Sequence, residues 1–405
     1  MKVSRIKIWA IFIWVLYVLI LLVILEIFTR YIFHYHLDSF TLQKNAYFEM
    51  DKLKVWNEKF IEERKDSFKN WPIEIETFKA TMSTPRYVFK PNLGVYIDDK
   101  NLVSKDFKND SIRWSSNSLG FRSKEVKKNK RDNVIRIIAL GASTTEGIKV
   151  SNNHTYPSIL ESILTGEGFD VEVINAGHSG YGIDDIIAFY NEKIIPLKPD
   201  IIIFYEVANN LVPTDWMPGW QWWNSWDTAY PTWFQFLHKH SAVIVTATKF
   251  FGIESKMPPT KKHAFSIDQP KPSVKYFHDK VKDLILSSKN NNIKIILSTF
   301  VTIAAENTQI KFGDNKELWK DLHFKWYPFT PGEIALIYQA YNNSIKDLAI
   351  SENVPIIDLA AIYPKDQKYF IDHIHFKPEG NQILASLIAD FLEKEVLNEN
   401  RAFAN

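Results

Sequence analysis

From about residue 133 the chain alternates short apolar runs with longer stretches in which apolar residues recur every three or four positions. The apolar runs are rich in β-branched residues, as buried parallel strands are, and predict strands at Val134–Leu140, Val171–Asn175, Ile201–Tyr205, Ile293–Thr299 and Pro355–Leu359. The longer stretches predict helices at about Tyr156–Leu164, Asp184–Ile195, Val274–Lys289, Pro331–Glu352 and Glu379–Val396. The sequence therefore predicts an α/β domain with a five-strand parallel sheet, in which ligands bind at the carboxyl ends of the strands.

The N-terminal part of the chain contains an uncharged apolar run, Ile8–Leu25. A helix of this length spans ~27 Å at ~1.5 Å per residue, which matches the hydrocarbon core of a bilayer. Lys2, Arg5 and Lys7 precede the run and only Arg30 follows it closely, so the positive-inside rule predicts a single-pass protein with a cytoplasmic N-terminus and a periplasmic or extracellular remainder. The alternative is a cleaved signal peptide, which the length of the run disfavours because the apolar core of such peptides is ~7–15 residues.

Three regions follow from these patterns: a transmembrane signal anchor at residues 1–30, a juxtamembrane stem with a small accessory region at 31–130, and the α/β domain at 131–397. Within the second region, apolar residues at helical spacing predict an amphipathic helix at Phe48–Lys69, either a stem or a helix on the membrane surface. Arg86–Ile97 predicts a strand, a turn and another strand, and Asn117–Arg122 predicts a turn centred on a glycine.

Composition narrows the class of protein. The chain has 49 Lys and Arg against 47 Asp and Glu, a net charge of +2, and no basic stripe of the kind that binds nucleic acid. It contains no cysteine, which excludes disulfides, cysteine nucleophiles and thiolate metal sites. We therefore expect no nucleic-acid partner and a chemistry carried by hydroxyl, carboxyl and imidazole side chains.

A serine follows the first predicted strand, in the sequence Gly-Ala-Ser-Thr-Thr-Glu-Gly at residues 141–147. This pattern predicts a strand, a tight turn and then Ser143 at the start of a helix. A serine hydroxyl becomes a good nucleophile when a base removes its proton, and a helix N-terminus stabilises developing negative charge. The alternative is an ordinary helix N-cap, a position that serine favours. For catalysis, a base must come from elsewhere in the chain.

Near the C-terminus, Asp372 lies three residues before His375, in a stretch that leads through Lys-Pro-Glu-Gly into the last helix. On a turn, such a carboxylate accepts the Nδ1–H of the imidazole and leaves Nε2 free to act as a base. His373 competes for the role of base and could instead be a metal ligand. No second cluster of His, Asp or Glu with metal-ligand spacing accompanies it, so we expect no metal.

Two more strand ends carry groups suited to binding an oxyanion. Gly180 ends the sequence Asn-Ala-Gly-His-Ser-Gly after the second strand, and Asn209 lies in Glu-Val-Ala-Asn-Asn after the third. A glycine N–H and an asparagine amide aimed at one point, together with the N–H of Ser143, form an oxyanion hole. The alternatives are a glycine in the left-handed conformation and an asparagine in an Asx-turn.

The order of these groups, with a serine, a glycine, an asparagine and Asp-x-x-His each after a strand of one sheet, resembles the SGNH hydrolases, the GDSL-type esterases and acylhydrolases. The resemblance covers roughly Asn133–Val396. It implies a three-layer, flavodoxin-like fold with a five-strand parallel sheet, no cofactor, and hydrolysis of acyl esters through an acyl-enzyme. It also implies that Ser143 is the nucleophile and that Gly180 and Asn209 belong to the oxyanion hole. Asp372 and His375 are then the remaining members of a catalytic triad.

Two positions depart from the family pattern. Ala142 stands where the family name has an aspartate, which looks similar to the Gly-Gly-Ser-Thr-Thr form of many bacterial members. Val207 stands where a glycine is common two residues before the asparagine, although Asn209 itself is present.

The predicted α/β domain also carries an insertion rich in tryptophan and proline at about residues 211–271, directly after the Asn209 turn. Tryptophan faces stack on sugar rings, so the candidates for substrate binding are Trp216, Trp220, Trp222 and Trp223. The alternatives are a packed lid over the sheet and contact with the membrane interface. In each case the insertion should border the site.

These observations favour a membrane-anchored serine esterase that removes acyl groups, with O-acetyl as the expected class, from a cell-envelope or extracellular glycan. One alternative is an O-acyltransferase that uses the same triad and passes the acyl group to a sugar hydroxyl. The other is a catalytically inactive glycan-binding or assembly protein on a hydrolase scaffold. Retention of Ser143, Asp372 and His375 argues against the inactive scaffold.

Overall fold

The computed structural model describes residues 5–32, 73–74, 88–89, 91–92, 94–97, 112–212, 271–305 and 329–398, with short pieces between residues 215 and 247 and between residues 307 and 326. Residues 1–55 and 221–261 form one compact unit, and residues 56–220 and 262–405 form a second one. The predicted amphipathic helix at Phe48–Lys69 lies outside the described residues, as does most of the tryptophan-rich insertion. All of the sheet and site described below belongs to the second unit.

The second unit is built on a parallel sheet of five strands, as predicted, and the strand order is β6-β5-β7-β8-β9. The strands span Ile135–Gly141 (β5), Val171–Gly177 (β6), Ile201–Tyr205 (β7), Lys294–Ser298 (β8) and Ile356–Ile357 (β9). β5 is the first strand of this sheet along the chain. The chain then forms β6 on one side of β5 and afterwards β7 on the other side. In such a sheet, the point where the strand order reverses is where ligands bind.

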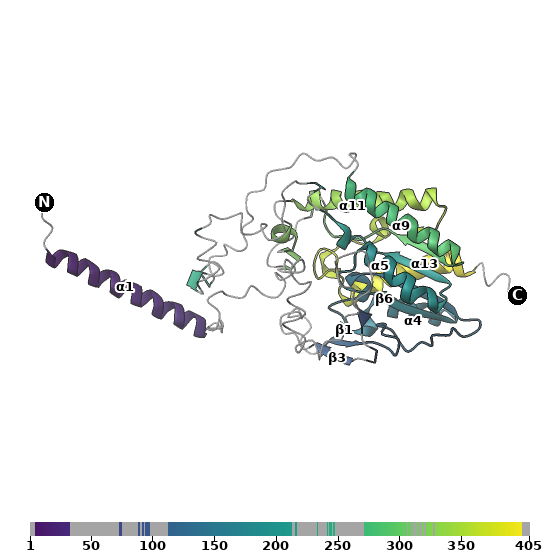
Figure 1. Ribbon diagram of the computed structural model, residues 1–405, viewed down its shortest axis with the longest axis horizontal. Coiled ribbons are helices and arrows are strands. Elements are labelled where there is room, and N and C mark those ends of the chain that lie inside the picture. The colour runs from purple at the N-terminus through teal and green to yellow at the C-terminus, as the bar shows by residue number, and fades with distance from the viewer. Residues whose placement is uncertain are drawn as a thin grey trace. The chain divides into compact units, whose positions relative to one another are not determined.

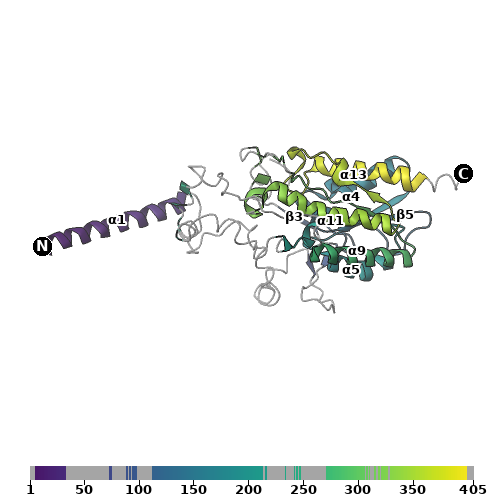
Figure 2. The ribbon, with the colours of Figure 1, turned by 90° about the horizontal axis from the view of Figure 1, so that it is seen from above.

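Helices cover both faces of the sheet (Figure 1). They are α4 (Tyr156–Gly166), α5 (Ile183–Phe189), α9 (Pro272–Asn290), α11 (Pro331–Ser351) and α13 (Pro378–Leu392). Figure 2 shows α4 and α13 on one side of the domain and α5 and α9 on the other, and α11 packs against α9. The predicted helix at Asp184–Ile195 is α-helical only to Phe189 and continues through a π-helical turn at Tyr190–Ile194.

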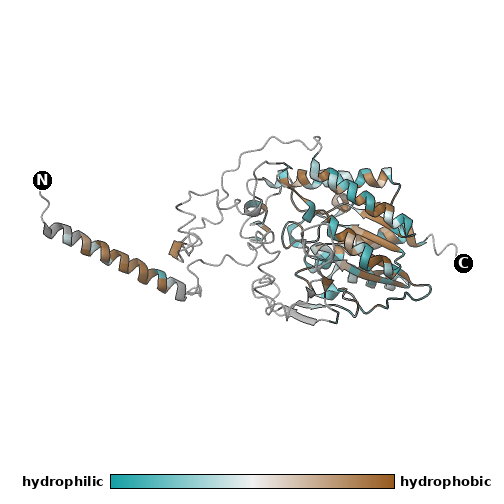
Figure 3. Cartoon of the chain, in the orientation of Figure 1, coloured by the Kyte–Doolittle hydropathy of each residue, from teal (hydrophilic) through white to brown (hydrophobic). Residues whose placement is uncertain are grey.

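The core is built on the strands, which stand out as hydrophobic in Figure 3, and on the helix faces packed against them. In β5, every side chain from Ile137 to Leu140 is 0% exposed, because helices cover both faces of the strand. Burial of one such aliphatic side chain stabilises the fold by about 1.5–3 kcal/mol. Arg136, near the start of β5, is also fully buried, and its guanidinium binds the Glu172 carboxylate and the Leu197 carbonyl.

Among the described residues, four short strands precede the large sheet. β1 (Ile73–Glu74) pairs with β2 (Val88–Phe89), and β3 (Gly94–Ile97) pairs with β4 (Ile112–Ser115), both antiparallel. The two strands predicted within Arg86–Ile97 are therefore present, in two different small sheets. The predicted glycine turn is also present: Gly120 has a φ of +82°, and the Asn117 side chain accepts hydrogen bonds from the N–H groups of Leu119 and Phe121.

In the first unit, α1 (Arg5–Ile32) contains a candidate membrane span at Phe12–Thr29. Its side chains are largely exposed and apolar, as Figure 3 also shows. A helix of this length and composition is compatible with a signal anchor or a signal peptide.

Candidate active site

The serine singled out in the sequence lies at the start of a short helix, α3 (Ser143–Glu146), directly after β5. The helix sits against the end of β6, and Gly177 makes this approach possible. A Cβ atom at Gly177 would lie 2.1 Å from the backbone nitrogen of Glu146. Ser143 is only 8% exposed, so its hydroxyl is held in a nearly enclosed place at the carboxyl end of the sheet.

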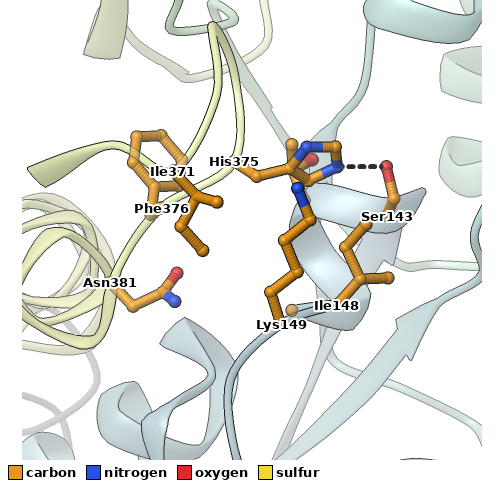
Figure 4. Close-up of a pocket in the computed structure, with 9 residues that line it drawn as sticks. Ser143, Ile148, Lys149, Ile371, His375, Phe376 and Asn381 are labelled. Atoms are coloured by element: carbon orange, nitrogen blue, oxygen red, sulfur yellow. Dashed lines mark hydrogen bonds between the residues drawn. The ribbon is translucent and has the colours of Figure 1, made fainter. Parts of the chain in front are cut away.

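The structure brings Ser143, His375 and Asp372 together, although Ser143 is more than two hundred residues from the other two. His375 Nε2 lies 2.8 Å from Ser143 Oγ, the contact drawn in Figure 4. His375 Nδ1 lies 2.8 Å from Asp372 Oδ2. The loop that carries both residues runs between a 3-10 turn at Gln367–Tyr369 and α13. Asp372 Oδ1 also accepts the backbone N–H groups of Ile374 and His375, which fixes the carboxylate within its own turn.

A lysine that the sequence analysis did not single out completes this arrangement. Lys149 Nζ lies 3.0 Å from Asp372 Oδ2, and the two side chains are 9% and 15% exposed. Burial alone would raise the pKa of Asp372, but the charges of His375 and Lys149 outweigh it and hold that pKa well below its usual range. Asp372 is therefore a carboxylate at neutral pH, as a partner for an imidazolium must be.

Both ring nitrogens of His373, the competing histidine, are engaged in a buried network with residues other than Ser143. Its Nδ1 contacts the Asp321 carboxylate, and its Nε2 lies 2.9 Å from the Tyr338 hydroxyl. Asp321, Asp372 and His373 each place one possible metal-ligand atom within 4.8 Å of the others. These atoms already bind protein groups, since Asp372 holds His375 and Lys149, so we assign them no metal.

The two predicted oxyanion-hole turns lie after β6 and β7, which flank β5 in the sheet. Gly180 has a φ of +79°, which favours glycine. The Asn209 amide donates to the Tyr181 carbonyl at 3.1 Å, and its backbone N–H donates to the Glu206 carboxylate at 2.7 Å. Burial raises the pKa of Glu206 to about 8.

The Gly180 turn is tied to the nucleophile helix as well. The Glu146 carboxylate accepts hydrogen bonds from the backbone N–H and the hydroxyl of Ser179, at 2.8 and 2.5 Å. Burial raises the pKa of Glu146, while these bonds and the charge of Arg122 oppose the shift. The turns after β5, β6 and β7 thus form one connected group of polar segments.

Arg122 is a second residue that the sequence analysis did not assign a role. It is 1% exposed, and its guanidinium donates to the carbonyls of Glu146 at 2.8 Å and Gly147 at 2.7 Å. It also donates to the Val150 carbonyl and the Asn152 side chain. An arginine directly after a glycine turn was the available signal in the sequence, but the long-range partners were not predictable.

Of the tryptophans proposed to bind substrate, the structure describes Trp216. It is 5% exposed, and the Lys271 ammonium lies 4.9 Å from its ring centroid. Its ring is therefore packed within the protein and offers no open face to a sugar. Trp220, Trp222 and Trp223 lie outside the described residues.

Comparisons with known proteins place the chain in a family. A family model for the GDSL-like lipases and acylhydrolases matches residues 139–383, which is more than half of the chain. No curated protein matched the chain.

Similar solved structures include an acetyl xylan esterase, AlAXEase, at 16% identity, covering 63% of this chain and 98% of that one, with a TM-score of 0.38. A lipase/acylhydrolase from Enterococcus faecalis is 17% identical over 64% of this chain and 95% of its own, with a TM-score of 0.38. An acetylxylan esterase from Geobacillus stearothermophilus is 16% identical over 64% of this chain and 95% of its own, also with a TM-score of 0.38. The family match over residues 139–383, on a five-strand parallel sheet, shows that the chain belongs to the GDSL-like lipase/acylhydrolase family of serine ester hydrolases.

Proposed function

We propose that this ester hydrolase uses Ser143, His375 and Asp372 as a catalytic triad to remove short acyl groups, O-acetyl above all, from a glycan outside the cytoplasm. The observation that carries the proposal is the chain of contacts from Ser143 Oγ through the His375 ring to the Asp372 carboxylate, each of 2.8 Å. Such a chain activates a serine hydroxyl at neutral pH.

In the proposed reaction, Ser143 Oγ attacks the ester carbonyl carbon while His375 Nε2 takes the hydroxyl proton. His375 then gives this proton to the departing alcohol oxygen as the carbon–oxygen bond breaks, which leaves an acyl-serine. A water molecule attacks the acyl carbon, with His375 again first taking and then returning a proton, and the carboxylic acid leaves. Asp372 holds Nδ1 and stabilises the imidazolium that forms in each half.

The negative charge on the carbonyl oxygen needs donors that are in place before the reaction. We assign these donors to the backbone N–H groups of Ser143 and Gly180 and to the Asn209 side-chain amide. The ties between the three turns support this assignment, because Ser179 is bound to Glu146 and Asn209 is bound to Tyr181. The turns are thereby held at neighbouring strand ends.

A small pocket lies beside the nucleophile. It is lined by Ser143, His375 and apolar side chains such as Ile148, Ile371 and Phe376 (Figure 4), which offer apolar contacts to a substrate next to the serine.

We also propose the arrangement of the chain around this site. Residues 1–30 serve as a signal anchor, residues 31–130 as a stem with a small accessory region, and residues 131–397 as the hydrolase domain. The apolar length of α1 and the positive charges before it support an N-terminus in the cytoplasm and a catalytic domain on the other side of the membrane.

The proposal is tested with the full chain in detergent, by comparing the wild type with Ser143→Ala on p-nitrophenyl esters of increasing chain length and on an O-acetylated polysaccharide. We expect hydrolysis of acetate esters, a decline with chain length, and loss of turnover in the variant without loss of the fold. Undiminished hydrolysis by Ser143→Ala would refute the triad. Ser143-dependent transfer of the acyl group to an added sugar, with no free acid released, would identify an acyltransferase instead.

A further inference from the structure

The turn after the nucleophile helix returns toward the triad and carries a lysine into it. Lys149 lies six residues after Ser143, yet its ammonium reaches Asp372 on the loop of the base, with Nζ 3.0 Å from Oδ2. Both side chains are largely buried. Figure 4 shows the Lys149 side chain between the turn and the His375 loop, with its ammonium pointing toward that loop.

The backbone that presents this lysine is unusual and is firmly held. Lys149 has a φ of +87°, a conformation that is uncommon for residues other than glycine and that persists where surrounding contacts fix it. Here the contacts are those of Arg122, which donates to the carbonyls of Glu146, Gly147 and Val150 on both sides of the lysine. The protein thus maintains an unfavourable backbone conformation at a position whose side chain pairs with Asp372.

The two oxygens of Asp372 share the His375 imidazole but differ in their other partners. Oδ1 lies 2.9 Å from His375 Nδ1 and accepts the backbone N–H groups of Ile374 and His375. Oδ2 lies 2.8 Å from the same nitrogen and accepts Lys149. Without the ammonium, Oδ2 would keep only the imidazole as a partner. The carboxylate would then be held mainly through Oδ1 within its own turn, and its charge would act on the imidazole without an opposing charge beside it.

We propose that Lys149 is a positioning residue for ester hydrolysis, which orients Asp372 and balances its charge so that the His375 imidazole stays available as a base. This inference rests on the proposed triad and goes beyond it. The pKa of Asp372 agrees with it, because the charges of His375 and Lys149 lower that pKa against the opposing effect of burial. Like charges within ~4–6 Å disfavour each other, so the ammonium opposes protonation of the nearby imidazole.

Other ionisable groups also face this loop and would act in wild type and variant alike. They are His373 and Asp321 from the neighbouring network, Tyr338 from α11 and Glu206 after β7. The hydrogen-bond partners of Asp372 Oδ2 are Lys149 and His375. A replacement of Lys149 should therefore change the pH profile without changing the contributions of these other groups.

The experiment compares Lys149→Met and Lys149→Gln with wild type in the full chain, using kcat/KM for p-nitrophenyl acetate as a function of pH. We expect the acid limb of the profile to move to higher pH by about one unit. We also expect kcat of the two neutral variants to fall about tenfold at neutral pH with little change in KM, because the orientation of Asp372 is lost. Lys149→Arg keeps a positive charge at this position and should therefore retain much of the wild-type kcat.

Lys130→Met is the matched control. Lys130 Nζ lies 2.6 Å from Asp200 Oδ2 at the other end of the sheet, so this variant removes a lysine–aspartate pair far from the triad. Its pH profile should match that of wild type. An NMR titration of the His375 imidazole gives a second measurement that needs no substrate, and its midpoint should rise in both neutral Lys149 variants.

The outcomes separate this inference from the proposed function. If wild type shows Ser143-dependent hydrolysis but the acid limb and the NMR midpoint are unchanged in Lys149→Met and Lys149→Gln, Lys149 has no positioning role. A shift of equal size in Lys130→Met would also overturn the inferred positioning role of Lys149. If no ester is hydrolysed in a Ser143-dependent way, the proposed function fails, and the NMR titration still decides whether Lys149 acts on His375.

Discussion

Replacement of Arg122 should slow catalysis as well as weaken the fold, because its guanidinium holds the turn that follows the nucleophile helix. The side chain is fully buried, and burial lowers the pKa of Arg122 to about 10, so it is still charged at neutral pH. It donates to the carbonyls of Glu146, Gly147 and Val150. The same turn leads directly from Ser143 to the lysine that contacts Asp372.

The size of the effect follows from the acceptors that would lose their donor. In Arg122→Met, three buried carbonyls lose a charged partner, and at ~1.5–3 kcal/mol for each lost hydrogen bond the free energy of unfolding should fall by roughly 4.5–9 kcal/mol. That is a large part of the ~5–15 kcal/mol that stabilises a typical domain, so this variant should fold poorly. Arg122→Lys keeps the charge but reaches fewer acceptors, and should lose about 2 kcal/mol.

The assay measures urea unfolding and kcat on p-nitrophenyl acetate for Arg122→Lys and for a matched control, Arg136→Lys. Arg136 is likewise 0% exposed and binds Glu172 and the Leu197 carbonyl, but it lies at the start of β5, away from the site. Both variants should lose stability to a similar degree. Only Arg122→Lys should lose kcat, by about tenfold or more, because small displacements of catalytic groups are costly.

Two results would refute this reasoning. Wild-type kcat in a folded but destabilised Arg122→Lys variant would show that the turn needs no such support. An equal loss of kcat in Arg136→Lys would show that general loosening of the fold is responsible. The rates must be measured at a urea concentration and temperature at which both variants remain folded.

Three further predictions follow from single contacts. Gly177→Ala should unfold at a markedly lower temperature, because its Cβ would lie 2.1 Å from a backbone nitrogen of the nucleophile helix, whereas Gly166→Ala, with open space around it, should not. Glu206 stays protonated up to a pKa of about 8 in the folded state but ionises near pH ~4.3 when unfolded, so the unfolded state binds fewer protons between these values. Urea unfolding of wild type should therefore show stability falling as pH rises from about 4 to 8, and Glu206→Gln should remove that slope. His373→Gln, where it folds, should keep kcat for p-nitrophenyl acetate within a few-fold of wild type, while His375→Gln should lower kcat by roughly three orders of magnitude or more. The opposite result would assign the role of base to His373.

Local patterns account for much of what was predicted. Apolar β-branched runs located all five strands, because a strand buried on both faces has little room for polar side chains. The pairing of Asp372 with His375 is also local, since a carboxylate that accepts N–H groups two and three residues ahead folds its own turn. The helix at Pro331–Ser351 began as expected, with Thr330 and Glu333 forming a capping box.

Boundaries depended on partner strands that local patterns do not reveal. β6 extends to Gly177, two residues beyond the prediction, because its end pairs with the end of β5 at Gly141. β9 is shorter than predicted and comprises only Ile356–Ile357, because only these two residues pair with β8, opposite Leu297 and Ser298. The extent of a strand is set by the neighbour that accepts its hydrogen bonds.

The sequence by itself determined the α/β class, the apolar N-terminal helix and the identity of the candidate serine, aspartate and histidine. Tertiary structure alone decided which of His373 and His375 faces Ser143, because the two lie two residues apart and both have a carboxylate partner. It also brought Lys149 to Asp372 and Arg122 to the turn after Ser143. Periodicity reports which face of an element is buried, whereas these contacts depend on strand order and turn conformation, which bring together residues far apart in the chain.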